Sequence, residues 1–213
     1  MIKLEKTGVF GWEAAIRGMR NPMNSWDKSD SHGCYMPCGT PCKYPLSYCI
    51  GTNDLKLMNK LAKAGDDHGK FLRMINVTVD ITAPLYWWKE FDTYKVGTVA
   101  NSCSTMHKIA DKEFTSYDFS IEHLEDLWLN DFYCLLWSLN EARNKYLETK
   151  DKKYWWQMIQ LLPSSYNQKR TVQLNYQVLK NMYNSRRNHK LNEWRQLCDW
   201  IEDLPYSELI TGE

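Results

Sequence analysis

One short segment, Asn101-Ser-Cys-Ser-Thr-Met-His107, concentrates side chains that can do chemistry. Its seven residues supply an amide, three hydroxyls, a thiol and an imidazole. Successive backbone N–H groups in such a loop can form a concave anion site. Cys103 would act as a nucleophile only if a base or a helix end lowered the pKa of its thiol. The segment therefore predicts a loop that binds an anionic ligand, and an ordinary Ser/Thr-rich turn is the alternative.

Two other polar clusters lie at expected junctions between elements. His68 and Lys70 follow Gly65, between a helix end and a strand start, where ligands often bind. Arg186 and Arg187 lie at a helix junction, and the guanidinium fork suits phosphates and the carbonyl edges of bases. Each cluster is a candidate ligand site, and a solvated turn is the alternative in both cases.

A third cluster consists of Cys34, Cys38, Cys42 and Cys49, with His32 nearby. Zinc prefers four thiolate or imidazole ligands, commonly with closely spaced cysteine pairs. The spacing permits a metal site, and a loop with free thiols is the alternative. The total of seven Cys is odd, and the charged start of the chain does not resemble a secretory signal. We therefore expect a cytoplasmic protein with reduced thiols.

The overall charge excludes some broad classes of partner. The 213 residues include 27 Lys and Arg against 26 Asp and Glu, so the net charge is +1. This balance gives no general reason to expect nucleic acid or an anionic membrane as a partner. No apolar run approaches the length of a membrane span. An anionic ligand would have to be held by a local site.

Hydrophobic periodicity predicts an α+β fold, with a small mixed sheet and a helical majority. We expect one domain over residues 1–213, with a loop insertion at about 21–52. The expected strands cover residues 2–10 and 71–82. The expected helices cover residues 11–19, 54–64, a segment opened by Pro84, and then 121–146, 153–161, 170–185 and 191–202.

Several of these segments match the motifs of one family in chain order. The matching residues are Asp67-His68-Gly-Lys-Phe71 at the start of a strand, Pro84-Leu-Tyr-Trp-Trp-Lys-Glu90 as a proline-led aromatic helix, Asn101-Ser-Cys-Ser104, Leu161-Leu-Pro163, Asn175-Tyr-Gln, and Arg186 or Arg187 before Glu193-Trp194. Over roughly residues 53–203 the chain resembles the flavin-dependent thymidylate synthase family, in a divergent, phage-like branch.

The resemblance implies an activity, its cofactors and an assembly state. Family members are homotetrameric methyltransferases of nucleotide biosynthesis. FAD supplies hydride, methylenetetrahydrofolate supplies carbon, NADPH is a further co-substrate, and the pyrimidine deoxynucleotide dUMP accepts the carbon. The cofactor carries the hard chemistry, and the protein orients and polarises the reactants.

The resemblance also assigns roles to individual residues. Glu90, Ser104 and Thr105 would contact the nucleotide, and Arg186 or Arg187 would polarise its base as the catalytic cation. The residues expected towards the flavin are His68, Lys95, Asn101 and Asn175. No metal ligand belongs to this expected site.

The chain departs from the family where positive charge is expected. Thr93-Tyr94-Lys95 stands where the family has Arg-His-Arg, and Met106 stands at the closing Arg of the loop. Removing one charge-assisted hydrogen bond costs roughly 1.5–3 kcal/mol. We consider three hypotheses in addition to the flavin-dependent enzyme. They are a non-catalytic nucleotide-binding protein on the same fold, a metal site in the cysteine-rich loop, and a variant in which Cys103 attacks the pyrimidine.

Overall fold

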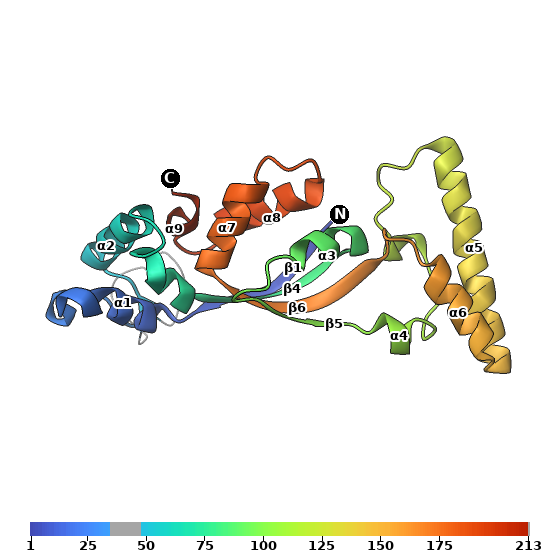
Figure 1. Cartoon of the computed structure of the whole chain (residues 1–213), viewed down its shortest axis with the longest axis horizontal. Coiled ribbons are helices and arrows are strands. Elements are labelled where there is room, and N and C mark those ends of the chain that lie inside the picture. The colour runs from blue at the N-terminus through green and yellow to red at the C-terminus, as the bar shows by residue number, and fades with distance from the viewer. Residues whose placement is uncertain (35–47, 213) are drawn as a thin grey trace. The chain divides into compact units, whose positions relative to one another are not determined.

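The computed structural model describes residues 1–34 and 48–212 (Figure 1). Cys38 and Cys42 of the expected metal site lie outside these described residues. Within the described ranges, no group of three or more His, Cys, Asp and Glu side chains is arranged to hold a metal ion. No helix in the described part of the chain is long and apolar enough to cross a membrane.

The fold combines a small sheet with a larger number of helices. The strands are β1 (Lys3–Phe10), β2 (His32–Gly33), β3 (Tyr48–Cys49), β4 (Asn76–Pro84), β5 (Val99–Ser102) and β6 (Asn167–Asn175). The α-helices are α1 (Trp12–Arg20), α2 (Thr52–Lys63), α3 (Leu85–Phe91), α4 (Thr105–Lys108), α5 (Asp126–Thr149), α6 (Lys152–Leu161), α7 (Tyr176–Arg186), α8 (Asn192–Glu202) and α9 (Glu208–Thr211). Short 3-10 helices are η1 (Asn21–Met23), η2 (Trp26–Lys28), η3 (Gly69–Met74) and η4 (Ser116–Asp118).

Four strands form one sheet in the order β1-β4-β6-β5, and β2 pairs with β3 in an antiparallel ribbon. The expected α+β class with a helical majority is confirmed. The chain divides into two compact units. The first contains Met1–Lys3, Ile81–Thr93 and Asn101–Thr171, and the second contains Leu4–Asp80, Tyr94–Ala100 and Val172–Glu213. The expectation of a single domain over residues 1–213 stays a prediction.

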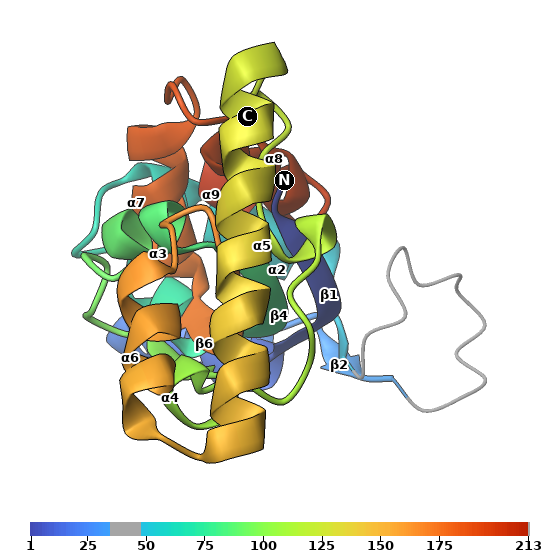
Figure 2. The same ribbon diagram turned by 90° about the vertical axis from the view of Figure 1, so that its right-hand side faces the viewer.

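In the first unit, α5 and α6 pack side by side (Figure 2). Phe132, Leu139 and Ala142 recur at helical spacing on α5 and are buried, as is Met158 of α6. The loop before α5 adds Phe119, whose ring meets that of Phe132 edge to face at 5.2 Å between centroids. The helical hairpin and this loop therefore share one hydrophobic core.

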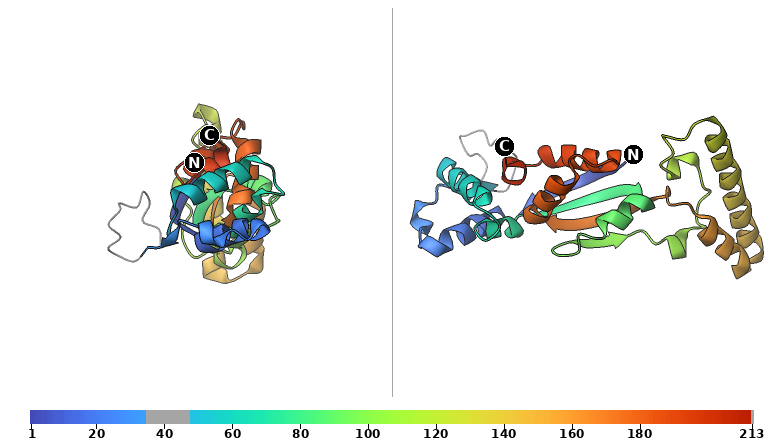
Figure 3. Two further views of the ribbon diagram at one scale, coloured as in Figure 1. Left: turned by 90° about the vertical axis from the view of Figure 1, so that its left-hand side faces the viewer. Right: turned by 45° about the horizontal axis from the view of Figure 1, so that its top comes forward.

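The second unit contains helices α1, α2, α7, α8 and α9 (Figure 3). Several aromatic side chains are buried in this unit. Trp12 of α1 meets Tyr176 of α7 edge to face at 5.4 Å between ring centroids. It also meets Tyr206, between α8 and α9, at 5.3 Å. Trp194 of α8 is fully buried in the same unit. Edge-to-face geometry adds to the hydrophobic stabilisation because ring edges are positive and ring faces negative.

A buried ion pair anchors the segment that follows α1. Arg20 Nε donates to Asp54 Oδ1 at 2.6 Å, and both side chains are almost completely buried. The other oxygen of Asp54 accepts from the hydroxyls of Ser29 and Ser31 and from backbone N–H groups. Burial alone would raise the pKa of Asp54, but the hydrogen bonds from Ser31, Ser29 and Arg20 and the charge of Arg20 hold it below its usual value.

Several element boundaries differ from the sequence-based expectation. The helix expected over residues 121–146 covers residues 126–149. The strand expected over residues 71–82 begins at Asn76, because Phe71 and Leu72 are both buried and continue a 3-10 turn. The helix expected over residues 170–185 begins only at Tyr176, and residues 167–175 form β6. Val172 and Leu174 alternate in burial within the sheet, and Asn175 then caps α7 by accepting from Val178 N at 3.1 Å.

We predict that Asp54→Asn lowers the free energy of unfolding by roughly 3–5 kcal/mol, because it leaves the charge of Arg20 buried without a counter-ion. Glu13→Gln is the matched control, since it breaks an exposed ion pair with Arg17 on α1. That change should cost less than about 1 kcal/mol. Denaturant unfolding measures both variants. An equal effect of the two substitutions would contradict the role given to Asp54.

The same pair predicts the acid limb of the stability curve. The pKa of Asp54 is lower in the folded chain, so its stabilisation is complete above the unfolded pKa of about 3.9. It disappears as the pH falls through the folded pKa. Asp54→Asn should therefore lose less stability than the wild-type protein when unfolding is measured from pH 5 downwards.

Candidate functional site

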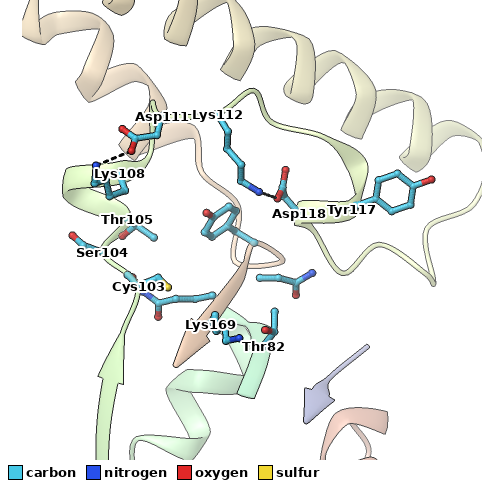
Figure 4. A pocket seen from close by; sticks show the side chains of 13 residues that line it. Thr82, Cys103, Ser104, Thr105, Lys108, Asp111, Lys112, Tyr117, Asp118 and Lys169 are labelled. Atoms are coloured by element: carbon cyan, nitrogen blue, oxygen red, sulfur yellow. Dashed lines mark hydrogen bonds and ion pairs between the residues drawn. The ribbon is translucent and has the colours of Figure 1, made fainter. Parts of the chain in front are cut away.

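A cavity of about 390 Å³ lies in the first unit, where β5 turns into α4 (Figure 4). It is rich in hydroxyl and ammonium groups. Its lining residues are Thr82, Cys103, Ser104, Thr105, Lys108, Asp111, Lys112, Tyr117, Asp118, Tyr166, Asn167, Gln168 and Lys169. This volume lies within the range of small-molecule sites, about 300–1,000 Å³. The cavity is thus large enough for a ligand of nucleotide size to enter at least in part.

The start of this turn is held by a chain of hydrogen bonds from β6. Cys103 N donates to Lys169 O at 2.9 Å, and Gln168 Nε2 donates to Cys103 O at 2.9 Å. Arg170 Nε donates to Gln168 Oε1 at 3.0 Å, which fixes the orientation of the amide. Arg170 also pairs with Asp92 at 2.7 Å. The guanidinium therefore determines which end of Gln168 faces the turn.

The rest of the segment is held by the helical hairpin. Trp155 of α6 donates its indole N–H to Met106 O at 3.1 Å. On α5, Asn140 donates to Phe114 O and accepts from Phe114 N, both at 2.9 Å. Arg143 donates to Ala110 O at 3.0 Å. Side chains from α5 and α6 thus satisfy backbone groups of the loop that lines the cavity.

Hydroxyl groups and ion pairs set the chemistry of the cavity. Ser104 caps α4, since its Oγ accepts from His107 N at 3.1 Å, and its O–H still has a proton to donate. Lys108 pairs with Asp111 at 2.8 Å, and Lys112 pairs with Asp118 (Figure 4). These carboxylates raise the pKa of both lysines, chiefly through the hydrogen bonds, so the ammonium groups stay charged at neutral pH.

Tyr166 is the half-buried phenol of this cavity. Its burial is the main cause that raises its pKa, and the carboxylate of Asp118 raises it further. The phenol therefore stays protonated at neutral pH and can donate a hydrogen bond. Hydroxyl donors and three lysines suit phosphate and sugar oxygens better than they suit base catalysis.

In the second unit, Arg186 and Arg187 have different surroundings. Arg186 Nε donates to Tyr94 Oη at 3.0 Å, and its guanidinium carbon lies 4.7 Å from the centroid of a Trp194 ring. Arg187 pairs with Glu202 and lies over the Tyr183 ring at 4.9 Å. Stacking on aromatic rings holds the Arg186 guanidinium in place. The Glu202 carboxylate offsets the charge of Arg187.

The loop that carries Lys95 rests against the start of α7. Gly97 has φ of +76°, and a Cβ there would lie 2.9 Å from Asn175 Nδ2. Only a glycine combines this backbone conformation with so close an approach. The exposed Lys95 and the capping residue Asn175 therefore belong to neighbouring segments, although the side-chain oxygen of Asn175 is engaged in capping α7.

A buried amide lies beside the turn that contains His68. Gln177 of α7 is only 5% exposed, and its Nε2 donates to Asp66 Oδ1 at 3.1 Å. Among the described residues, its Oε1 has no hydrogen-bond partner. That oxygen lies 3.9 Å from where a Cβ of Gly69 would be. Buried acceptors are rarely left unsatisfied, so this oxygen is a candidate acceptor for a ligand donor.

The residues expected at the functional site belong to both units, and only two of them line the cavity. Ser104 and Thr105 line the cavity, whereas Glu90 on α3 and Asn101 on β5 belong to the same unit but not to its lining. His68, Lys95, Asn175, Arg186 and Arg187 belong to the second unit.

Sequence reasoning missed several residues that line the cavity of the first unit, and one residue beside the turn that contains His68. These are Lys112, Tyr166, Gln168 and Lys169 of the cavity, and Gln177 beside the His68 turn. The lysines look like ordinary surface residues in the sequence. The alternation of Gln168, Val172 and Leu174 is a signal that could have revealed β6.

Two solved structures resemble this chain along nearly its whole length. One is a crystal structure of flavin dependent thymidylate synthase ThyX from Helicobacter pylori, complexed with FAD and dUMP. Its TM-score is 0.68 at 15% sequence identity, and the match covers 97% of this chain and 96% of that one. A second ThyX structure from Helicobacter pylori, with FAD and dUMP, has a TM-score of 0.67 at 15% identity and covers 98% and 96%.

The chain has the fold of flavin-dependent thymidylate synthase. No family model matches it, and no curated protein sequence matches it. The structural matches confirm the expected resemblance at the level of the fold.

We predict that Gln168→Glu loosens the segment over residues 103–108, because a carboxylate accepts from Arg170 but cannot donate to Cys103 O. Two acceptors would then face each other, at a cost of roughly 1–3 kcal/mol. Hydrogen exchange in this segment should accelerate. Gln157→Glu on the exposed side of α6 is the control and should leave the exchange unchanged. Equal exchange in both variants would remove Gln168 from its positioning role.

Proposed function

We propose that this protein transfers a one-carbon unit to a dUMP-type deoxynucleotide with the help of FAD. The nucleotide would bind in the cavity of the first unit, and this cavity is the observation that carries the proposal. The turn Cys103–Thr105, whose residue types predict an anion site, borders a hollow lined by three lysines and several hydroxyls. Two crystal structures of ThyX from Helicobacter pylori, which has the same fold, contain FAD and dUMP.

The nucleotide side of the proposal uses hydroxyl donors and lysines. The Ser104 and Thr105 hydroxyls would donate to phosphate or sugar oxygens, and Lys169 would supply positive charge beside Lys108 and Lys112, whose charges are offset by Asp111 and Asp118. Glu90 would contact the nucleotide from α3, outside this lining. A covalent role for Cys103 stays a separate prediction.

The flavin side uses the second unit. The Oε1 of Gln177 is an acceptor that suits an N–H donor on a flat heteroaromatic ligand. His68, Lys95 and Asn175 lie on segments that meet α7 near this amide. These residues fit FAD, which would supply a hydride when bound. Asn101, NADPH and methylenetetrahydrofolate keep the roles that the resemblance implies, as a flavin-side residue and as the co-substrates.

We assign the catalytic cation to Arg186. Its guanidinium lies 4.7 Å from the centroid of a Trp194 ring and donates to Tyr94 Oη, so it is held in place, whereas Arg187 is more exposed. A fixed cation stabilises negative charge as it develops on a pyrimidine during carbon transfer. The resemblance left the choice between Arg186 and Arg187 open, and this assignment selects Arg186.

The second candidate function is a nucleotide-binding protein that has lost flavin binding. It is favoured by the exposed Lys95, which supplies the one cation of Thr93-Tyr94-Lys95. The cavity would then keep its ligand while the second unit would not bind FAD. A phage origin, a cytoplasmic location and a homotetrameric methyltransferase belong to the first proposal.

The absorption spectrum of the purified protein tests the flavin. We expect a yellow protein with bands of bound FAD, and mass spectrometry of the released ligand should identify it. A colourless protein that takes up no FAD on reconstitution, yet is stabilised by dUMP in a thermal shift, would favour the second candidate. Stabilisation by neither ligand would contradict both.

We predict that Arg186→Gln lowers kcat by about 10- to 150-fold, because it removes one charge-assisted interaction worth roughly 1.5–3 kcal/mol. The matched variant Arg187→Gln should change kcat little, because it breaks an exposed pair with Glu202. Steady-state turnover of dUMP by the FAD-loaded protein measures both. The reverse order of effects would transfer the catalytic role to Arg187.

A further inference from the structure

The loop between α3 and β5 turns one large side chain inward, that of Tyr94. Every other position from 92 to 97 is exposed, and Val96 is 90% exposed, whereas Tyr94 is half-buried. The centroid of its ring lies 5.9 Å from that of a Trp194 ring. Trp194 is fully buried on α8, so it provides a fixed surface for the tyrosine. The hydroxyl of a tyrosine packed in this way usually finds a hydrogen-bond partner.

The partner of the Tyr94 hydroxyl is Arg186, the last residue of α7. Arg186 Nε donates to Tyr94 Oη at 3.0 Å, and the guanidinium carbon lies 5.7 Å from the centroid of the Tyr94 ring. The same carbon lies 4.7 Å from a Trp194 ring centroid. The hydrogen bond is directional and fixes where Nε points, while the packed rings limit how the guanidinium plane can tilt. Two contacts of different geometry thus orient one planar group.

An arginine at a helix end needs such contacts in order to act as an oriented cation. Its side chain carries about 2 kcal/mol of rotamer entropy, which a ligand contact would otherwise have to overcome. Donors that are already oriented stabilise developing charge because they need not move during the reaction. Arg187, the next residue, is exposed and pairs with Glu202 instead. The contact with Tyr94 therefore belongs to one of the two adjacent arginines and not to the other.

The loop that carries Tyr94 is itself held against the start of α7. Three residues after Tyr94, Gly97 approaches the capping residue so closely that an added Cβ would lie 2.9 Å from Asn175 Nδ2. The same added atom would lie 3.3 Å from Val178 Cγ2. The loop thus contacts α7 near its first residue through Gly97 and at its last residue through Tyr94. Because the loop is held at both positions, it can fix the place of Arg186.

We infer that Tyr94 is a positioning residue for Arg186, and that its phenol oxygen sets the direction in which the guanidinium meets a pyrimidine. The inference rests on the proposed function, in which Arg186 is the catalytic cation. Tyr94 accepts from Nε, so a base would be contacted by the Nη groups of the guanidinium. In the sequence, Thr93-Tyr94-Lys95 stands out for the charge that it lacks. In the fold, its middle residue acts on the cation through a neutral hydroxyl.

NMR of the ligand-free protein tests the contact itself. The Nε–H signal of Arg186 is identified as the arginine signal that Arg186→Gln removes. Tyr94→Phe keeps the ring and loses the acceptor, so this Nε–H should exchange with water about 2- to 12-fold faster, the range expected for one lost hydrogen bond. Tyr183→Phe is the matched control, because it removes the same atom but that hydroxyl donates to Glu202. Unchanged exchange in Tyr94→Phe, or an equal change in both variants, overturns the inference.

Turnover tests whether Tyr94 acts through Arg186. Tyr94→Phe should lower kcat by about 2- to 12-fold and leave the KM for dUMP nearly unchanged, because the guanidinium is still present but less well oriented. Tyr183→Phe should keep the wild-type kcat. In an Arg186→Gln background, Tyr94→Phe should have no further effect, since residues that act through one another are not additive. A full additional loss in the double variant would mean that Tyr94 acts independently, which contradicts the inference.

The two measurements separate the inference from the function on which it rests. A wild-type protein without turnover, in which Tyr94→Phe still accelerates exchange at Arg186, would contradict the proposed function while confirming that Tyr94 orients the guanidinium. Wild-type turnover that Tyr94→Phe leaves unchanged would keep the function and overturn the role of Tyr94. Each tyrosine variant loses a single oxygen atom and should stay folded, which circular dichroism checks.

Discussion

The cavity of the first unit depends on how one buried amide is oriented. Gln168 has a donor end and an acceptor end, and only one orientation satisfies both neighbours. Arg170 supplies a donor to its oxygen, so its nitrogen must point at Cys103 O. Arg170 is itself held by Asp92 and lies 4.1 Å from the centroid of a Trp88 ring. A charge on β6 thus fixes the polarity of the amide and, through it, the turn that opens the cavity.

Much of the fold follows from periodicity, and the exceptions have clear causes. α1 and α2 follow from apolar spacing and from the residues that end them. β6 does not, because Lys169 and Arg170 interrupt its apolar alternation and leave only the weaker signal of Gln168, Val172 and Leu174. Its contacts are also distant in the sequence, since Gln168 donates to Cys103, 65 positions earlier. The residues after β6 favour a helix, so the sequence-based prediction starts that helix too early, inside β6.

The candidate site was predictable by residue type but not by partner. Ser104 and Thr105 are recognisable as short polar groups in a loop, and they line the cavity. The difference between Arg186 and Arg187 is invisible in the sequence, since it depends on Trp194 for one and Glu202 for the other. The side chains that surround each guanidinium in the folded protein decide how its charge is held. Two adjacent arginines can therefore have different functional roles.

Gly97 ties together two parts of the second unit that the sequence presents as independent. The smallest side chain added there would press on the amide of Asn175, the residue that caps α7, and Arg186 is the last residue of that helix. A side chain at position 97 would therefore have to displace the amide of Asn175, which caps α7. Substitutions at position 97 should be inherited only together with changes at position 175, so the two sites are expected to vary as a pair among descendants of this chain.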